Sequence, residues 1–285
     1  MKDKIEGRII SYLQNRQLSD GGFFFAGVEP SSGKDTYLAT LALTLLGADF
    51  DKRAVLNFWD GKMKNKSLQE YSIMFWALES LKFLRTEASL FERRWKQRAT
   101  SLIEDRLTLK KFSANEDTGK ISMGFDANML AIALIGKRLE DLFYLLSLCL
   151  TLGIAVDGSE AVRFIAELQQ ENGGFSEKII SDSPTTLWSL KILKLLNYPF
   201  PKREKIRSFL QSQFFSSDDL ENLYCVTEGL LLLGENYLPR KNEALDFVFS
   251  CQRANGGFSR ARTIGIATIE NTFQAVKILR SYGTV

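Results

Sequence analysis

Apolar segments of one length recur along the chain, and most of them begin at Asp or Asn and end at glycine. The segment from Asp35 to Gly47 is apolar on nearly every side between these two residues. Asp or Asn at a helix start can accept hydrogen bonds from free backbone N–H groups, and glycine can adopt the left-handed conformation that ends a helix. We therefore predict buried helices about three turns long. The closing glycine lies twelve residues after the opening residue in 35–47, 141–153, 222–234 and 271–283, while 185–197 ends at Asn and 70–84 fits more loosely.

Amphipathic segments precede several of these buried helices. The first places Ile5, Ile9, Ile10 and Leu13 on one face and Lys, Arg and Glu on the other, which is the periodicity of a half-exposed helix. Outer helices of this kind around buried inner helices predict a closed double ring. The amphipathic segments are 4–17, 160–170, 203–213 and 242–252.

A short phrase, Gln followed by Gly-Gly-Phe, joins outer segments to the inner helices that follow them. Self-similarity at this scale is typical of repeat proteins, because one helical hairpin cannot bury its own apolar face. We predict that the Gln side chain and the glycine turn brace adjacent hairpins while Phe fills the gap between helices. The fold class is predicted as all-α, an (α/α)6 toroid of six helical hairpins formed by residues 1–285 as a single domain. The phrase runs from Gln17 to Phe23, from Gln169 and Gln170 to Phe175, and from Gln252 to Phe258.

The middle of the chain is less regular. Residues 87–109 predict one long helix, 110–123 a polar loop, and 125–136 another helix. Either helix could pair with the inner helix that opens at Asp141, and the sequence leaves both pairings open. No segment shows the sustained alternation that predicts a strand.

Composition and charge narrow the class of protein. The chain has 285 residues, 45% of them apolar, and a net charge of +3, so it can bury one large core and no nucleic-acid partner is indicated. The start lacks an apolar signal region, and the longest apolar run, 142–154, is too short to span a bilayer. Cys149, Cys225 and Cys251 form an odd set within or beside predicted helices. We expect buried thiols and a cytoplasmic protein without a transmembrane segment.

The sequence contains no histidine. A Ser-His-Asp triad, a Cys-His pair and imidazole general-base catalysis are therefore excluded. Chemistry in this chain must come from carboxyl, phenol, amine or thiol groups.

The Gln and Gly-Gly-Phe turn followed by Asp35-Thr36-Tyr37 or Asn271-Thr272-Phe273 resembles the repeat of the protein prenyltransferase β subunits and of the squalene and class II terpene cyclases. The likeness covers nearly the whole chain and is clearest at 4–47 and 157–283. It implies an isoprenoid or polyprenyl ligand in a central cavity. Because protein prenyltransferases pair this toroid with a helical-repeat subunit, it also implies a helical partner subunit.

In the prenyltransferases the resemblance implies a zinc site with an Asp, a Cys two positions later and a His on a later helix. Asp141 matches the aspartate, but Phe143 stands where the thiolate would be and Gln274 where the imidazole would be. We expect no zinc, since both of its strong ligands are missing; magnesium stays open. Arg138 and Tyr144 match positions that contact the substrate diphosphate in that family, although the stretch 136–141 could equally be a charged surface turn.

In the class II cyclases the resemblance implies an aspartate that protonates an alkene at an inner-helix start. Candidates here are Asp35, which could instead cap its helix, and Asp219 in the acidic stretch 217–221. Asp141 is a third candidate carboxyl. Such an acid must be kept protonated by burial or by a neighbouring carboxylate.

Aromatic residues gather near the predicted inner-helix starts. Such rings could line an isoprenoid cavity and stabilise a carbocation, or each could simply fill the core. The candidates for ligand contact are Tyr37, Tyr71, Trp76, Tyr144, Trp188, Tyr224 and Phe273.

Three functions are compatible with these patterns. We favour a toroid that binds an isoprenoid, or its diphosphate, and catalyses prenyl transfer or cyclisation without zinc. One alternative is a non-catalytic toroid that docks a protein or peptide, with a shallow or plugged lumen. The other is a carbohydrate-active α/α-barrel enzyme, which would need two carboxylates facing each other across the mouth, such as Asp141 with Asp219 or Glu270.

Overall fold

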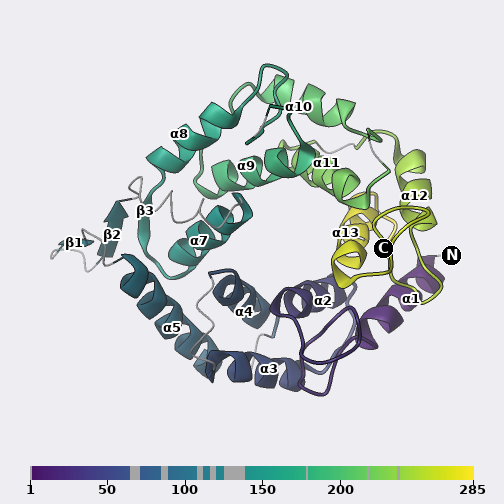
Figure 1. The fold of residues 1–285 in the computed structure, drawn as a ribbon, viewed down its shortest axis with the longest axis horizontal. Helices are drawn as coiled ribbons and strands as arrows, with labels where there is room; N and C mark the ends of the chain where they lie inside the picture. Colours follow the sequence, from purple (N-terminus) through teal and green to yellow (C-terminus); the bar gives the residue numbers. More distant parts are fainter. Residues whose placement is uncertain are drawn as a thin grey trace.

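A computed structural model describes residues 2–64, 71–84, 89–107, 112–115, 120–124, 139–177, 179–216, 218–235 and 238–285. Within these ranges twelve helices form two concentric rings (Figure 1). The inner ring consists of α2 (Gly33–Leu45), α4 (Tyr71–Phe83), α7 (Leu139–Thr151), α9 (Ser183–Leu195), α11 (Leu220–Leu232) and α13 (Ile269–Ser281). The outer ring consists of α1 (Lys2–Gln14), α3 (Lys52–Lys64), α5 (Ser89–Leu107), α8 (Ser159–Leu168), α10 (Arg203–Ser212) and α12 (Lys241–Ser250).

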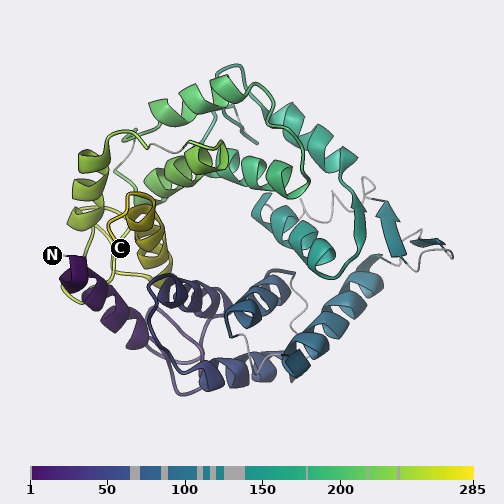
Figure 2. The ribbon, with the colours of Figure 1, turned by 180° about the vertical axis from the view of Figure 1, so that it is seen from behind.

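The ring is closed. Each inner helix packs against the next one, and the last of them, α13, packs against the first, α2. The two chain ends therefore lie close together on one side of the molecule, as the view from behind also shows (Figure 2). The predicted all-α (α/α)6 toroid is confirmed. No helix in the ranges given above is long and apolar enough to cross a membrane.

Three short strands interrupt the helical pattern, and they correct the prediction of a polar loop at 110–123. Strand β1 (Phe112–Asn115) pairs antiparallel with β2 (Lys120–Gly124), and β2 pairs in parallel with β3 (Ala155–Asp157). The pairing of β2 with a strand after α7 is a long-range contact, which local periodicity does not reveal.

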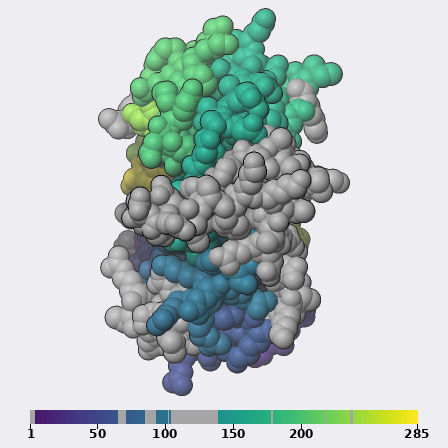
Figure 3. Space-filling view, turned by 90° about the vertical axis from the view of Figure 1, so that its left-hand side faces the viewer, coloured from purple at the N-terminus to yellow at the C-terminus, as the bar shows by residue number. Residues whose placement is uncertain are grey.

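The long helix predicted at 87–109 is confirmed as α5, which packs against α3 and α4. The helix predicted at 125–136 lies outside the described residues. In side view, the blue surface of α5 and the teal surface of α8 lie at opposite ends of one face (Figure 3).

The Gly-Gly-Phe turns brace neighbouring hairpins as predicted. Gln17 donates from Nε2 to the carbonyl oxygens of Gly21 (3.2 Å) and Asp51 (3.1 Å). Gly21 has a φ of 88°, and a Cβ added there would lie 2.0 Å from the carbonyl oxygen of Ala54 in α3. Glycine is required because no side chain fits between this turn and the next outer helix. Phe23 is fully buried.

The threonine that follows each turn holds the phenylalanine in place. The Phe23 N–H donates to Thr36 Oγ1 at 2.9 Å, and the same bond joins Phe175 to Thr186 (3.0 Å) and Phe258 to Thr272 (3.0 Å). Each hydroxyl in turn donates to the backbone carbonyl four residues earlier. These buried backbone groups are thereby satisfied, which fixes the inner helix against its turn.

The inner helices begin earlier than their sequence predicts. Asp35, Asn222 and Asn271 were the expected caps, but the N-cap residues lie three positions before them. Ser, Asp or Thr at the N-cap accepts a backbone N–H of the first turn, and each of these caps is in extended conformation. Ser32, Asp182 and Thr268 also pair with the Phe of the preceding turn in a short bridge. The closing glycines have positive φ, as predicted, and so does Asn197. The observed caps are Ser32, Asp182, Asp219 and Thr268.

Candidate functional site

A cavity of about 580 Å³ fills the centre of the inner ring. All six inner helices contribute to its wall. The volume lies within the range of roughly 300–1,000 Å³ that is typical of small-molecule sites. The wall residues occupy three levels, because side chains three or four positions apart share one face of a helix.

The first level is a charged rim at the start of the inner helices. Its members are Lys34, Glu140, Glu221 and Glu270. Lys34 Nζ lies 2.7 Å from Glu270 Oε1, and this ion pair joins α2 to α13 across the closure of the ring. The glutamates lie in the first turns of α7, α11 and α13, where the positive end of the helix dipole stabilises a carboxylate.

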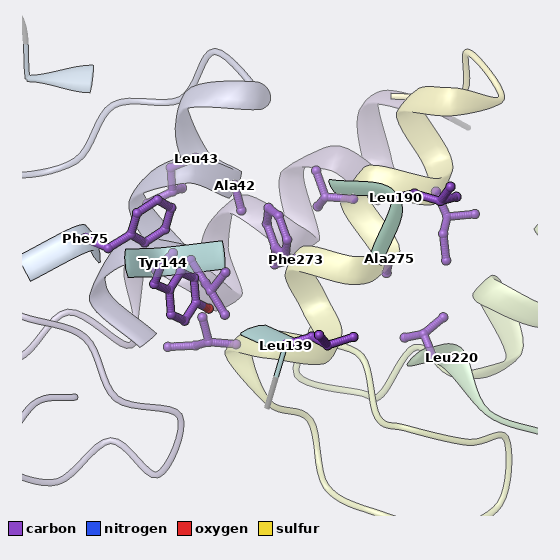
Figure 4. Packing of buried hydrophobic residues seen from close by; sticks show 14 of the residues in the cluster. Ala42, Leu43, Phe75, Leu139, Tyr144, Leu190, Leu220, Phe273 and Ala275 are labelled. Carbon is purple, nitrogen blue, oxygen red and sulfur yellow. The ribbon is translucent and has the colours of Figure 1, made fainter. Parts of the chain in front are cut away.

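The second level is a ring of aromatic side chains, one turn deeper. Tyr144 stacks on Phe75 with ring centroids 4.6 Å apart, and Figure 4 shows these two rings side by side with Phe273 on the nearby α13. Other pairs of the level meet edge-to-face, as Tyr37 with Phe75 and Tyr224 with Phe273, or tilted, as Phe143 with Trp188. Such contacts stabilise aromatic clusters. The members of this level on the cavity wall are Tyr37, Phe75, Phe143, Tyr144, Trp188, Tyr224 and Phe273.

The third level is polar again. Glu79 and Lys82 form an ion pair on α4, and Ser147 and Lys191 come from α7 and α9. The aromatic ring thus lies between two polar levels, a layout suited to a long apolar ligand with a polar end.

Burial changes the acidity of several wall groups. It raises the pKa of the Glu221 carboxyl, and the nearby Asp219 and Glu270 carboxylates raise that pKa further. Burial also raises the pKa of Tyr37 and of Tyr144. The Tyr144 hydroxyl donates a hydrogen bond to Glu140 Oε1. A carboxyl whose pKa is raised beside an apolar lumen is a candidate proton donor.

The predicted ligand-contact residues divide into three groups. Tyr37, Tyr144, Trp188, Tyr224 and Phe273 all line the cavity. The described lining includes neither Trp76, which packs edge-on against Tyr144 at 5.7 Å, nor Tyr71, the half-buried first residue of α4. Arg138 lies outside the described residues.

The three predicted catalytic aspartates are not part of the described cavity wall. Asp35 turns toward the preceding loop and accepts the Phe25 N–H at 3.1 Å. Asp219 caps α11 and accepts from Arg260 Nη2 at 2.6 Å. Asp141 is half-buried in the first turn of α7.

Apart from Glu270, named as one member of a possible carboxylate pair, the charged residues of the wall were not singled out from the sequence. A signal for them exists, because each except Lys82 lies three or four positions from an aromatic wall residue on the same helix face. Glu221 precedes Tyr224 by three, Glu140 precedes Phe143 by three, and Lys191 follows Trp188 by three. The pattern could not show which face points inward, since these helices are apolar almost all round.

The residues at the implied zinc position do not fit that metal. Phe143 and Gln274 both line the cavity, and neither supplies a thiolate or an imidazole. Across the residues that the structure describes, no three Cys, Asp or Glu side chains gather closely enough to hold a metal ion. No step of the chemistry below uses a metal.

Comparison with models of known protein families identifies the family of this chain. Residues 1–67, 53–214 and 204–284 match the prenyltransferase alpha-alpha toroid domain. The chain belongs to the prenyltransferase α/α-toroid family. No curated protein sequence matches it.

Solved structures of this toroid family share the fold at low sequence identity. Protein geranylgeranyltransferase-I from Candida albicans, complexed with GGPP, is 17% identical with a TM-score of 0.67, covering 99% of this chain and 91% of that one. A variant of the type II terpene cyclase MstE from Scytonema, in complex with its substrate geranylgeranyl dihydroxybenzoate, is 12% identical with a TM-score of 0.57, covering 99% and 96%. A protein from Actinoplanes is 13% identical with a TM-score of 0.55, covering 99% of both chains. At these identities the likeness concerns the fold alone.

Proposed function

We propose that this toroid binds an isoprenoid chain in its central cavity. The single observation that supports this best is the aromatic level, which receives side chains from all six inner helices. Branched, unsaturated hydrocarbon chains match such a surface because they gain from apolar burial and from contact with ring faces. Two of the structural relatives were solved with a geranylgeranyl compound, which agrees with the proposal. A protein-docking scaffold would instead need a shallow or plugged lumen.

The catalytic part of the proposal concerns Glu221. Its half-buried carboxyl lies at the rim above Tyr224, and desolvation raises its pKa although Arg260 Nη2 lies 4.0 Å from Oε2. We place a proton donor here rather than at Asp35, Asp141 or Asp219. A proton given to an alkene carbon of the bound chain would create a carbocation, which the faces of Tyr37, Trp188 and Phe273 could stabilise.

Binding is tested by thermal shift and by Trp fluorescence with geranylgeranyl diphosphate, farnesyl diphosphate and the uncharged geranylgeraniol. We expect at least one of them to raise the melting temperature in a concentration-dependent way, since a ligand that binds only the folded state stabilises it. Leu150 is the useful position for a blocking variant, because it lines the cavity and is 44% exposed. Leu150→Trp should fill part of the lumen and weaken binding about 10-fold or more.

The matched control is Leu231→Trp. Leu231 is 38% exposed on α11 and is not part of the described cavity wall. Its replacement should leave affinity unchanged. If no isoprenoid shifts the melting temperature, or if both variants bind as the wild type does, the binding proposal fails.

The proton donor is tested separately with the ligand that binds. Prolonged incubation followed by mass spectrometry and chromatography of the extracted lipid should show an isomerised or cyclised product. Glu221→Gln keeps the side-chain shape but cannot supply the acidic proton, so the product should be lost while the thermal shift remains. A product that forms equally well with the variant would remove Glu221 from the mechanism.

A further inference from the structure

Lys191 is the cation on the cavity wall that the proposed function does not use. It lies on α9 at the deep polar level. Its Nζ sits 4.0 Å from the ring centroid of Trp188 and 5.9 Å from the centroids of Phe143 and Tyr224. Three rings therefore surround an ammonium group, and cation–π attraction holds it toward the lumen.

No carboxylate in the described part of the chain forms an ion pair with Lys191. The other two lysines on the wall are paired, Lys34 with Glu270 and Lys82 with Glu79. Glu228, the carboxylate with the greatest influence on Lys191, lies 3.1 Å from the Nζ of Lys277 on α13. Burial lowers the pKa of Lys191, since it disfavours the charged ammonium and no carboxylate in that part of the chain lies close enough to offset this.

A second group near this level also lacks a partner. Ser147 lines the cavity from α7, the helix beside α9, and is only 7% exposed. Its hydroxyl makes no hydrogen bond in the structure. The buried Ser147 hydroxyl and the half-buried Lys191 ammonium would both gain from a ligand that supplies an acceptor.

Charge on the wall limits what that ligand can be. The lining holds the three lysines Lys34, Lys82 and Lys191 and the four carboxylates Glu79, Glu140, Glu221 and Glu270. Removing the two ion pairs leaves Lys191 as the cation and Glu140 and Glu221 at the rim, and Glu221 lies 4.0 Å from Arg260 Nη2. One negative charge on the ligand is matched by Lys191, whereas the several charges of a diphosphate would exceed this single cation and be repelled by the rim.

We propose that Lys191, with Ser147, binds the carboxylate head group of an isoprenoid acid whose hydrocarbon tail lies along the aromatic level toward the rim. This inference rests on the proposed function, since it assigns a polar end to the isoprenoid that the cavity holds. The ammonium and the hydroxyl donate to the carboxylate oxygens, and the bond is charge-assisted. The orientation follows: the head lies deep in the toroid, and the tail end lies nearest Glu221.

The test uses equilibrium dialysis at constant pH to compare three ligands that share one hydrocarbon chain and differ in the head group. They are geranylgeranoic acid, geranylgeraniol and geranylgeranyl diphosphate. On the wild type we expect the acid to bind about 10- to 100-fold more tightly than the alcohol, as charge-assisted hydrogen bonds predict, and more tightly than the diphosphate. Lys191→Met should remove the preference for the acid and leave the alcohol affinity close to its wild-type value. Lys194→Met, on the exposed face of the same helix, is the matched control and should keep the preference.

The outcomes separate the two proposals. If none of the three ligands binds, the proposed function itself fails. If the alcohol or the diphosphate binds the wild type as tightly as the acid does, the isoprenoid proposal stands and the head-group assignment is overturned. The same conclusion follows if Lys191→Met keeps the preference. If Lys191→Met does not fold, the comparison of the three ligands on the wild type still tests the head-group assignment. Ser147→Ala should then bind the acid several-fold more weakly and bind the alcohol as the wild type does.

Discussion

Replacing Gly256 with alanine is expected to destabilise the whole toroid by more than about 3 kcal/mol, as overlap with a backbone and an unfavourable φ together predict. Gly256 has a φ of 92°, and a Cβ there would lie 2.3 Å from the carbonyl oxygen of Arg8 and 2.9 Å from its carbonyl carbon. Those atoms belong to α1, the first helix of the chain, so the contact joins the last repeat to the first. Neither side can move without separating α12 and its turn from α1.

Urea unfolding monitored by circular dichroism measures this effect, with Gly283→Ala as the control. Gly283 also has a positive φ, of 69°, but a Cβ there would meet nothing within 4 Å. The control should therefore lose only the free energy that it costs to hold alanine at a positive φ, about 1 kcal/mol. The difference between the two variants isolates the contact that closes the ring. Equal losses would mean that the turn of the last repeat does not depend on close packing against α1.

The second large effect is a fall in stability with rising pH that comes from Asp35. Burial raises the pKa of this carboxyl from 3.8 to about 6, although the Phe25 N–H that it accepts works in the opposite direction. Between these two values the folded protein holds a proton that the unfolded chain has released. Stability contributed by that proton is present below pH 3.8 and is lost as the pH rises through about 6.

Asp35→Asn tests this effect, because the amide oxygen can still accept the Phe25 N–H and carries no charge at any pH. Relative to the variant, the wild type should lose about 3 kcal/mol of unfolding free energy between about pH 3.5 and about pH 6.5. Other carboxyls titrate in both proteins, so the difference between them at each pH is the quantity to plot from urea unfolding. A difference that is flat, or that favours the wild type at higher pH, would show that Asp35 is ionised in the fold without a penalty.

The arrangement of Asp35 also explains why its assignment as a catalytic acid could not be decided from sequence. The pattern Asp35-Thr36-Tyr37 places three adjacent side chains on three different sides of α2. Thr36 holds the preceding turn, Tyr37 lines the cavity, and Asp35 turns to the loop at Phe25. The same triplet therefore serves the fold and the cavity at once, and only the tertiary contacts show which residue does which.

The sequence alone determined the ring. Glycine at positive φ, a cap at each inner-helix start and the Gln and Gly-Gly-Phe turn are properties of short segments, so their repetition along the chain was enough to predict six stacked hairpins. It also located most aromatic wall residues, because most rings near an inner-helix start lie one turn below the rim, although Tyr71 and Trp76 do not line the described cavity. The caps were misplaced by three residues, since Ser32 and Thr268 act as caps only in combination with a bridge to Phe23 and Phe258.

Only the tertiary structure showed which charged side chains face the lumen and which of them are paired. Glu79 and Lys82 pair within α4, but the other wall lysines and glutamates depend on side chains that come from another part of the ring, as with Lys34 and Glu270, 236 residues apart. Among the described residues Lys191 has no counter-ion, because Lys277 on α13 pairs with the carboxylate of Glu228. Electrostatic pairing is a property of distance in space, and the closure of the ring sets that distance.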